Sequence, residues 1–190
     1  MIETPLPKDD PLSFEDKKKY SDRLKIARKL TGQDDAVLIA KGKVQNIDVV
    51  VGAQDFRFIG GSFGAASGEA FIAGAQHAIE NKIPYIVVLA DPTTGGVCAS
   101  FAMLGDILIA EKGATIGFAG RRVIEQTLRE KLPNKFQTSE YLLKHGFVDS
   151  IIIRTQQKKM LSQLISIHQP FLPVLPLLNR NSDYLLDNEL

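Results

Sequence analysis

The sequence predicts an α/β domain, and three observations carry that prediction. Runs of β-branched residues of strand length alternate with stretches whose apolar residues recur at helical spacing. The 190 residues are 44% apolar and 24% charged, which is the balance of a globular domain. Clusters of glycine separate several of these strand-like and helix-like stretches. We expect a lead-in and helix at 1–31, the main domain at 32–168 and a carboxy-terminal tail at 169–190.

The amino-terminal third predicts one helix and two strands. After a lead-in rich in proline and charge, "SFEDKKKYSDRLKIARKL" is typical of a basic helix, in which Ser13 and Asp16 form an approximate capping box. This helix should end near Gly32. The runs "DAVLIAKGKV" and "IDVVVGAQDF" then predict two adjacent strands, joined by a polar turn at Gln45 and Asn46.

A glycine-rich loop and a helix are expected next. The stretch "RFIGGSFGAASGEAFIAGAQHAIENK" begins with small residues and then places Phe71, Ile72, Ala75 and Ile79 at helical spacing. The run "IPYIVVLA" that follows is continuously apolar, as in a strand that is buried on both faces of a sheet.

The last third of the main domain predicts short strands followed by helices. "DILIAE" and "ATIGFAG" are short strands, whereas "RRVIEQTLREKL" and "TSEYLLKH" are helical, with a break at Pro133 between them. The run "GFVDSIII" predicts one more strand, and an amphipathic helix should extend from about residue 155 to 167.

Composition and charge exclude several classes of function. There are 23 basic and 22 acidic side chains, and the net charge of +1 predicts no role on nucleic acid or on anionic membranes. The only cysteine, Cys98, cannot form an internal disulfide, and one cysteine with three scattered histidines makes no zinc site. Without a signal peptide or an apolar run of about 20 residues, the sequence predicts a cytoplasmic protein outside the membrane.

The stretch "DPTTGGVCASFAMLGD" places two adjacent glycines between an apolar strand and an apolar run that resembles a helix. The unpaired backbone N–H groups at such a corner attract anions, and glycines let a ligand oxygen approach them. Gly95 and Gly96 could therefore stabilise the negative charge that develops on a thioester oxygen during enolate formation. A tight turn with close helix–strand packing explains the same pattern, and the motif alone leaves both interpretations open.

Four long stretches resemble one known family: "TGQDDAVLIAKGKV", "DFRFIGGSFGAASGEA", "VLADPTTGGVCASFAMLGDILIAE" and "IGFAGRRVIEQTLREKLPNKFQTSEYLLKHGFVDSIII". Together they resemble the carboxyltransferase beta subunit of the bacterial multi-subunit acetyl-CoA carboxylase. The resemblance covers residues 11–153. It implies the crotonase-like fold, which consists of stacked β-β-α units whose oxyanion holes hold acyl-CoA enolates.

The resemblance also implies a reaction, partners and site residues. A carboxyl group would move from carboxybiotin to the methyl carbon of acetyl-CoA, giving malonyl-CoA. In the family, biotin is attached to a separate biotin carboxyl carrier protein, and an alpha subunit supplies the other half of the site in a hetero-oligomer. Gly95 and Gly96 match the family's oxyanion glycines. For substrate binding we assign Thr94, Gly60, Gly61, Arg121 and Arg122; each arginine could instead cap a sheet edge or contact the partner subunit.

Two departures from the family pattern shape the expectations. The family's amino-terminal zinc ribbon with four cysteines has no counterpart here, so we expect no zinc in this chain. The run "KIPYIVVLADPTTGG" also fuses two similar strands of the family. The "SGGARMQEG" loop and a long helix that lie between those strands are missing, which shortens the chain near residues 84–90. The resemblance implies that this loop forms one wall of the acyl-CoA pocket. A chain without the loop could act only as an interaction or assembly subunit.

A third interpretation starts from "GVCASFAM", which also resembles the nucleophile segment of Clp-type serine peptidases of the same fold. Ser100 or Cys98 would then be a nucleophile. A serine nucleophile needs a histidine base within hydrogen-bond reach. His145 follows Ser100 by more than forty residues, and His77 is expected on an exposed helix face, so small-residue packing explains this segment better.

Overall fold

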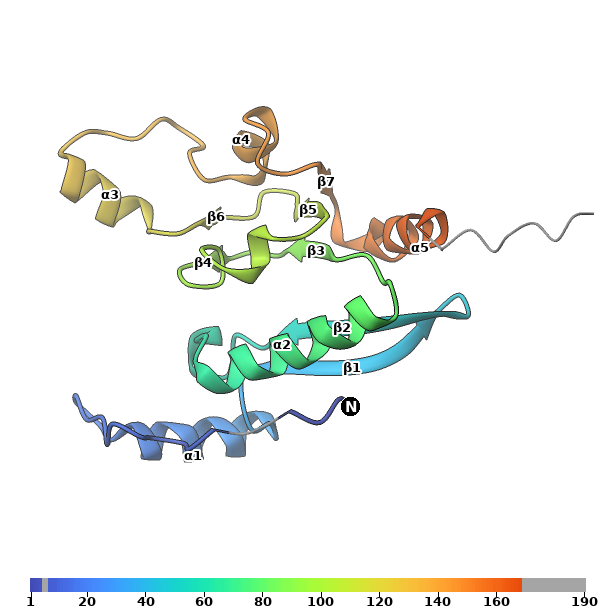
Figure 1. The fold of residues 1–190 in the computed structure, drawn as a ribbon. Coiled ribbons are helices and arrows are strands. Elements are labelled where there is room, and N and C mark those ends of the chain that lie inside the picture. Colours follow the sequence, from blue (N-terminus) through green and yellow to red (C-terminus); the bar gives the residue numbers. More distant parts are fainter. Residues whose placement is uncertain (5–6, 169–190) are drawn as a thin grey trace, which may run out of the picture.

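The computed structural model describes residues 1–4 and 7–168, so the predicted tail at 169–190 lies outside the described residues. Figure 1 shows α1 beneath a β-hairpin, a long helix α2 along that hairpin, and the remaining short strands above α2. The helices are α1 (Tyr20–Thr31), α2 (Ala65–Glu80), α3 (Arg121–Leu128), α4 (Ser139–Lys144) and α5 (Gln157–Ile167), with short 3-10 helices η1 (Ile59–Gly61), η2 (Phe101–Met103) and η3 (Arg154–Gln156). The strands are β1 (Val37–Val44), β2 (Ile47–Gln54), β3 (Ile86–Leu89), β4 (Thr93–Thr94), β5 (Ile107–Glu111), β6 (Ile116–Gly117) and β7 (Ser150–Ile152).

The two predicted amino-terminal strands are confirmed as an antiparallel hairpin. β1 and β2 pair along their full lengths, from Val37 opposite Gln54 to Val44 opposite Ile47. Gln45 and Asn46 form the turn with φ values of 49° and 66°. A two-residue turn with both φ positive matches the twist of the flanking strands, which fixes the register of the hairpin.

The predicted helix α2 is confirmed, and it packs on this hairpin through small residues rather than through its large apolar ones. Its buried residues are Ser67, Ala70 and Gly74, whereas Ile79 of the predicted apolar face is 75% exposed. The reason is close approach: a Cβ at Gly74 would lie 2.9 Å from Cγ2 of Ile39 on β1. Small residues let the helix and the hairpin approach closely, so the larger side chains turn away from the hairpin.

The carboxy-terminal half is built on a parallel sheet in the order β3-β5-β7, beside a separate parallel pair of β4 with β6. Leu89 and Ile109 are each 1% exposed and lie in the centre of this half. β3 is an edge strand, and in the described part of the chain no strand joins it to the hairpin. Glu111 at the end of β5 is buried and binds Arg154, whose hydrogen bonds lower the pKa of the carboxyl group.

Three local predictions were wrong. The proposed capping box does not form, because Ser13 has φ 49° and α1 begins only at Tyr20, while Asp16 accepts a hydrogen bond from the Lys18 N–H. The run after Gly96 is not an α-helix but a series of turns and the 3-10 helix η2. α3 ends at Leu128, before Pro133, because Arg129 adopts a left-handed conformation with φ 57°.

Candidate functional site

The predicted glycine corner is a turn that is tied to the neighbouring segment at 114–119. β4 pairs in parallel with β6, with Thr93 opposite Ile116 and Thr94 opposite Gly117. The Thr93 N–H donates to the Thr115 carbonyl at 2.9 Å, and the Thr115 N–H donates to a carboxylate oxygen of Asp91 at 2.7 Å. The chain that leads into the glycines is therefore held at Thr115 by one backbone hydrogen bond and by one bond to the Asp91 side chain.

The two glycines have different surroundings. The Gly95 N–H donates to the carbonyls of Gly117 and Phe118, at 3.2 and 3.0 Å, and Gly95 has φ 71°, a conformation that favours glycine. Gly96 is exposed and its φ lies outside the left-handed region. Within the described residues its N–H has no backbone acceptor, and a Cβ at Gly96 would meet no atom within 4 Å. Gly95 therefore fixes the turn, and the Gly96 amide stays open to a ligand.

The glycine loop before α2 lies next to this turn through an aromatic cluster. Gly60 and Gly61 both have φ 68°, and Gln54 Nε2 donates to the Gly61 carbonyl at 2.5 Å. The ring centroid of Phe63, just after the loop, lies 5.0 Å from that of Phe101 in η2. Phe101 thus connects the segment after Gly60 and Gly61 to the segment after Gly95 and Gly96.

Tyr85 and Phe71 complete the aromatic cluster around Phe101. The ring of Phe71 on α2 lies 4.4 Å from that of Phe101 and 5.7 Å from that of Tyr85. The Tyr85 hydroxyl donates to the Phe101 carbonyl at 2.7 Å, and burial raises the pKa of Tyr85 to about 12. Tyr85 therefore stays protonated and acts as a hydrogen-bond donor that holds η2.

The two arginines at the start of α3 also differ. The Arg121 guanidinium donates to the carbonyls of Leu132 and Pro133, at 2.5 and 3.0 Å, and to Glu125. These bonds fold the loop after α3, so Arg121 is engaged within its own chain. Arg122 is exposed, and no hydrogen bond or ion pair engages its side chain within the described residues. Of the pair, Arg122 is the one that can meet an anion.

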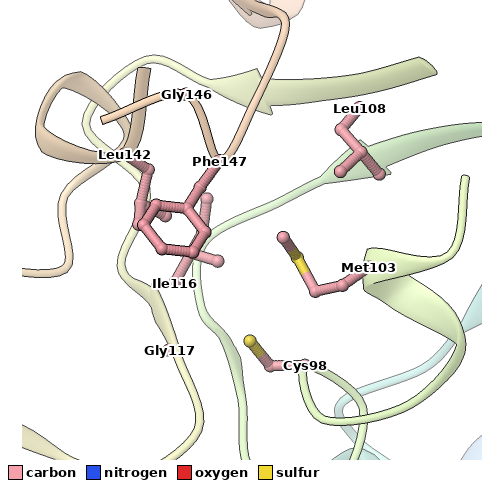
Figure 2. A pocket seen from close by; sticks show the side chains of 8 residues that line it. All are labelled: Cys98, Met103, Leu108, Ile116, Gly117, Leu142, Gly146 and Phe147. Carbon is pink, nitrogen blue, oxygen red and sulfur yellow. The ribbon is translucent and has the colours of Figure 1, made fainter. Parts of the chain in front are cut away.

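An apolar pocket of about 510 Å³ lies beside the glycine turn (Figure 2). Its lining includes Gly117, whose carbonyl accepts from Gly95. Figure 2 shows Cys98 and Met103 on one side and Leu142 and Phe147 on the other; Leu108, Ile116 and Gly146 complete the lining. Burial raises the pKa of Cys98, which keeps this thiol protonated. No local sequence pattern marks this pocket, because its residues come from four separate segments of the chain.

The contacts of Ser100 and His145 do not support the peptidase interpretation. The Ser100 hydroxyl donates to the Gly96 carbonyl at 2.5 Å, within its own turn. His145 Nδ1 lies 2.7 Å from the Tyr141 carbonyl oxygen, one helical turn away. A nucleophile and its base must share a hydrogen bond, and these two side chains each bind elsewhere.

No metal cluster and no membrane-spanning helix occur in the part of the chain that the structure describes. No group of three or more His, Cys, Asp or Glu side chains is arranged to hold a metal ion there. None of the helices in residues 1–4 and 7–168 combines the length and the apolar character needed to cross a membrane.

We predict that the purified chain carries no stoichiometric zinc, because tetrahedral zinc sites use cysteine and histidine ligands and Cys98 is the only cysteine. Elemental analysis of the purified, unchelated protein checks this. One zinc ion per chain that survives dialysis would contradict the prediction.

Solved structures with the same arrangement of elements are carboxylases, decarboxylases and transcarboxylases. The chain matches the transcarboxylase 12S hexamer core with a TM-score of 0.63 at 18% identity, over 69% of this chain and 33% of that one. It matches a Pseudomonas malonate decarboxylase hetero-tetramer with a TM-score of 0.57 at 20% identity, over 73% and 69% of the two chains. The fold is thus the crotonase-like α/β fold of carboxyltransferases, as predicted.

Curated relatives narrow the class further. The acetyl-coenzyme A carboxylase carboxyl transferase subunit beta of Microcystis aeruginosa is 49% identical over 92% of this chain and 67% of its own length. The protein of the same name from Synechococcus elongatus is 47% identical over 91% of this chain and 70% of its own. No protein-family model matches the chain. The chain belongs to the family of acetyl-coenzyme A carboxylase carboxyl transferase beta subunits.

The alignments also agree with an internal shortening. The chain spans about two thirds of the length of these relatives. The alignment with the Microcystis protein runs over 213 positions but uses 92% of the 190 residues here, about 175, so about 38 positions of the relative have no counterpart. The position of this gap near residues 84–90 stays a prediction.

Proposed function

We propose that this chain is the beta-subunit half of a carboxyltransferase that converts acetyl-CoA to malonyl-CoA, the entry step of fatty acid synthesis. Residues 32–168 form the carboxyltransferase domain. The observation that carries the proposal is the glycine turn, in which the Gly95 N–H is bound twice by the 117–118 backbone while the Gly96 N–H stays exposed. A fixed and unpaired donor of this kind stabilises an oxyanion without reorganising during the reaction.

In this reaction the carboxyl carbon leaves a ring nitrogen of carboxybiotin and bonds to the methyl carbon of acetyl-CoA. The methyl group loses a proton, which ends on the biotin nitrogen, and negative charge develops on the thioester oxygen on the way. We assign the donor to that oxygen to the Gly96 amide, one residue after the fixed Gly95. This refines the expectation from the sequence, since Gly95 itself serves to hold the turn.

Biotin enters this scheme as a substrate group on a separate carrier protein, where it supplies the activated carboxyl group. The exposed position of Gly96 fits a group that must arrive from outside the chain. Thr94 is also exposed and precedes the turn, so we assign it to substrate binding with Gly60 and Gly61, whose loop is joined to the turn through Phe63 and Phe101.

A partner subunit is supported by the surface around α3. This helix has no buried residue, and Figure 1 shows it at the periphery of the fold. Phe118, Val123 and Leu128 on or beside it are 67%, 57% and 59% exposed. Apolar side chains gathered on one peripheral helix favour contact with another protein. We assign this surface to the alpha subunit of a cytoplasmic hetero-oligomer.

The proposal is tested by binding before turnover. The chain should bind acetyl-CoA, and it should copurify with the alpha subunit of one of the relatives when both are expressed together. Isothermal titration with acetyl-CoA and size-exclusion chromatography of the pair measure the two properties. Loss of both would contradict the proposed function, whereas assembly without acetyl-CoA binding would identify a subunit that only assembles.

Arg121 and Arg122 should respond differently to substitution. We expect Arg122→Ala to weaken acetyl-CoA binding about three- to ten-fold with little change in Tm, because one exposed charge-assisted contact to a phosphate is lost. Arg121→Ala should instead lower the Tm by a few degrees, because two carbonyls in the loop after α3 lose their donor. Titration and thermal unfolding of both variants separate the two effects, and equal acetyl-CoA affinities would rule out Arg122 as an anion contact.

A further inference from the structure

Gln137 binds strand β6 and the residues after it on the side opposite the glycine turn. The side chain is buried, with the residue only 9% exposed, and its Nε2 donates to the Ala119 carbonyl at 2.6 Å. Its backbone carbonyl accepts from the Ile116 N–H at 2.8 Å. One residue therefore binds the segment at 116–119 near both of its ends.

Gly117 lies between Gln137 and the glycine turn. A Cβ at Gly117 would overlap Nε2 of Gln137 and would lie 2.8 Å from its Cδ, so only glycine lets this side chain cross the strand. The Gly117 carbonyl accepts from the Gly95 N–H. Gln137, Gly117 and Gly95 thus form a continuous line of contacts that ends one residue before Gly96.

The segment at 117–119 has little other support on its carboxy-terminal side. Phe118 is 67% exposed, and α3, which begins two residues later, has no buried residue. The bond from Gln137 to Ala119 therefore adds to the β4–β6 pairing in fixing the two carbonyls bound by Gly95. Gln137 also has φ 66°, an uncommon conformation for a residue other than glycine, and such conformations persist where the surrounding contacts dictate them.

We propose that Gln137 is a positioning residue for the oxyanion turn, acting through the Gly117 and Phe118 carbonyls on the Gly95 amide and so on the direction of the Gly96 N–H. This inference rests on the proposed function for its catalytic meaning. The chain of contacts from Gln137 through Gly117 to Gly95, which we call the mechanical link, can be tested independently of any activity.

The mechanical link is tested by amide hydrogen exchange in the full chain labelled with nitrogen-15. In Gln137→Met, which keeps the volume of the side chain but lacks the donor, the Gly95 amide should exchange about five- to ten-fold faster. Amides of the β1–β2 hairpin should exchange as before. Gln126→Met, on the exposed side of α3, is the matched control and should change neither.

An unchanged Gly95 exchange rate in Gln137→Met would overturn the proposal, and so would a uniform increase that includes the hairpin, because that pattern reports general destabilisation. If Gln137→Met does not fold, Gly117→Ala provides the second variant, since its Cβ displaces the same side chain. The same selective change at Gly95 is then expected, and its absence overturns the proposal.

The catalytic meaning is tested by kinetics in a chain that turns over acetyl-CoA. There Gln137→Met should lower kcat about ten-fold while KM for acetyl-CoA stays within about two-fold, because the turn is misdirected but still present. An unchanged kcat with faster Gly95 exchange would overturn the catalytic role alone. If no form of the protein makes malonyl-CoA, the proposed function fails, and the exchange data still decide the mechanical link.

Discussion

Restoring the missing internal segment should raise the rate of malonyl-CoA formation by about a hundred-fold or more. The restored chain would carry the "SGGARMQEG" loop, its helix and the second strand at the gap predicted near residues 84–90, to which we assign the roughly 38 positions of the relative that have no counterpart. That loop is expected to form the wall of the pocket opposite Gly96. Misplacement of reacting groups by about one ångström can cost a hundred-fold in rate.

The structure gives a physical reason for this expectation. β3 is an edge strand, and the parallel sheet and the β1–β2 hairpin share no strand pairing in the described residues. The core is divided likewise, with one cluster around Leu89 and Ile116 and another around Ile39 and Ala70. The restored strand and helix would have an unpaired sheet edge to join, so the added segment should order rather than remain an appended loop.

The comparison needs turnover and binding measured side by side. Both forms are combined with the alpha subunit and the carboxylated carrier, and malonyl-CoA is quantified by mass spectrometry. Acetyl-CoA affinity should differ much less than turnover, because binding tolerates loose geometry better than transition-state stabilisation does. A Gly/Ser linker of the same length, inserted at the same place, controls for added chain. Equal turnover by the short chain and the restored chain would show that β3 rebuilds the pocket unaided.

Local sequence patterns predicted the elements well where they reflect backbone requirements. The helix end at Gly32 was confirmed because its left-handed conformation favours glycine, and the hairpin turn was confirmed at Gln45 and Asn46, the polar pair that separates the two β-branched runs. The packing face of α2 was not predicted, since Ser67, Ala70 and Gly74 are selected for close approach rather than for apolar character. Hydrophobic spacing reports which residues are apolar, not which face can approach another element.

The candidate site was predictable only in part, for a similar reason. The motif identified Gly95 and Gly96 as a pair, but their different roles depend on the Gly117 and Phe118 carbonyls more than twenty residues away. Gln137 lies 37 residues further along the chain than Ser100 and bears no motif of its own. Its contribution follows from a contact with the Gly117 backbone, which a single sequence does not encode in any local pattern.

Gly96→Val should lower kcat about a hundred- to a thousand-fold in the chain with the segment restored. The loss of one oxyanion donor typically removes about 3 kcal/mol of transition-state stabilisation, and a β-branched side chain would occupy the space in front of the amide. The fold should tolerate the change, because the φ of Gly96 lies outside the left-handed region and a Cβ there meets no atom within 4 Å.

The control for this substitution is Gly42→Val on strand β1. Gly42 also has no atom within 4 Å of an added Cβ and lies outside the left-handed region, but it belongs to the hairpin rather than the glycine turn. Its variant should keep kcat, and both variants should keep the Tm of the parent within a few degrees. Steady-state kinetics with acetyl-CoA then isolates the Gly96 amide: a kcat within a few-fold of the parent in Gly96→Val would mean that another donor holds the thioester oxygen.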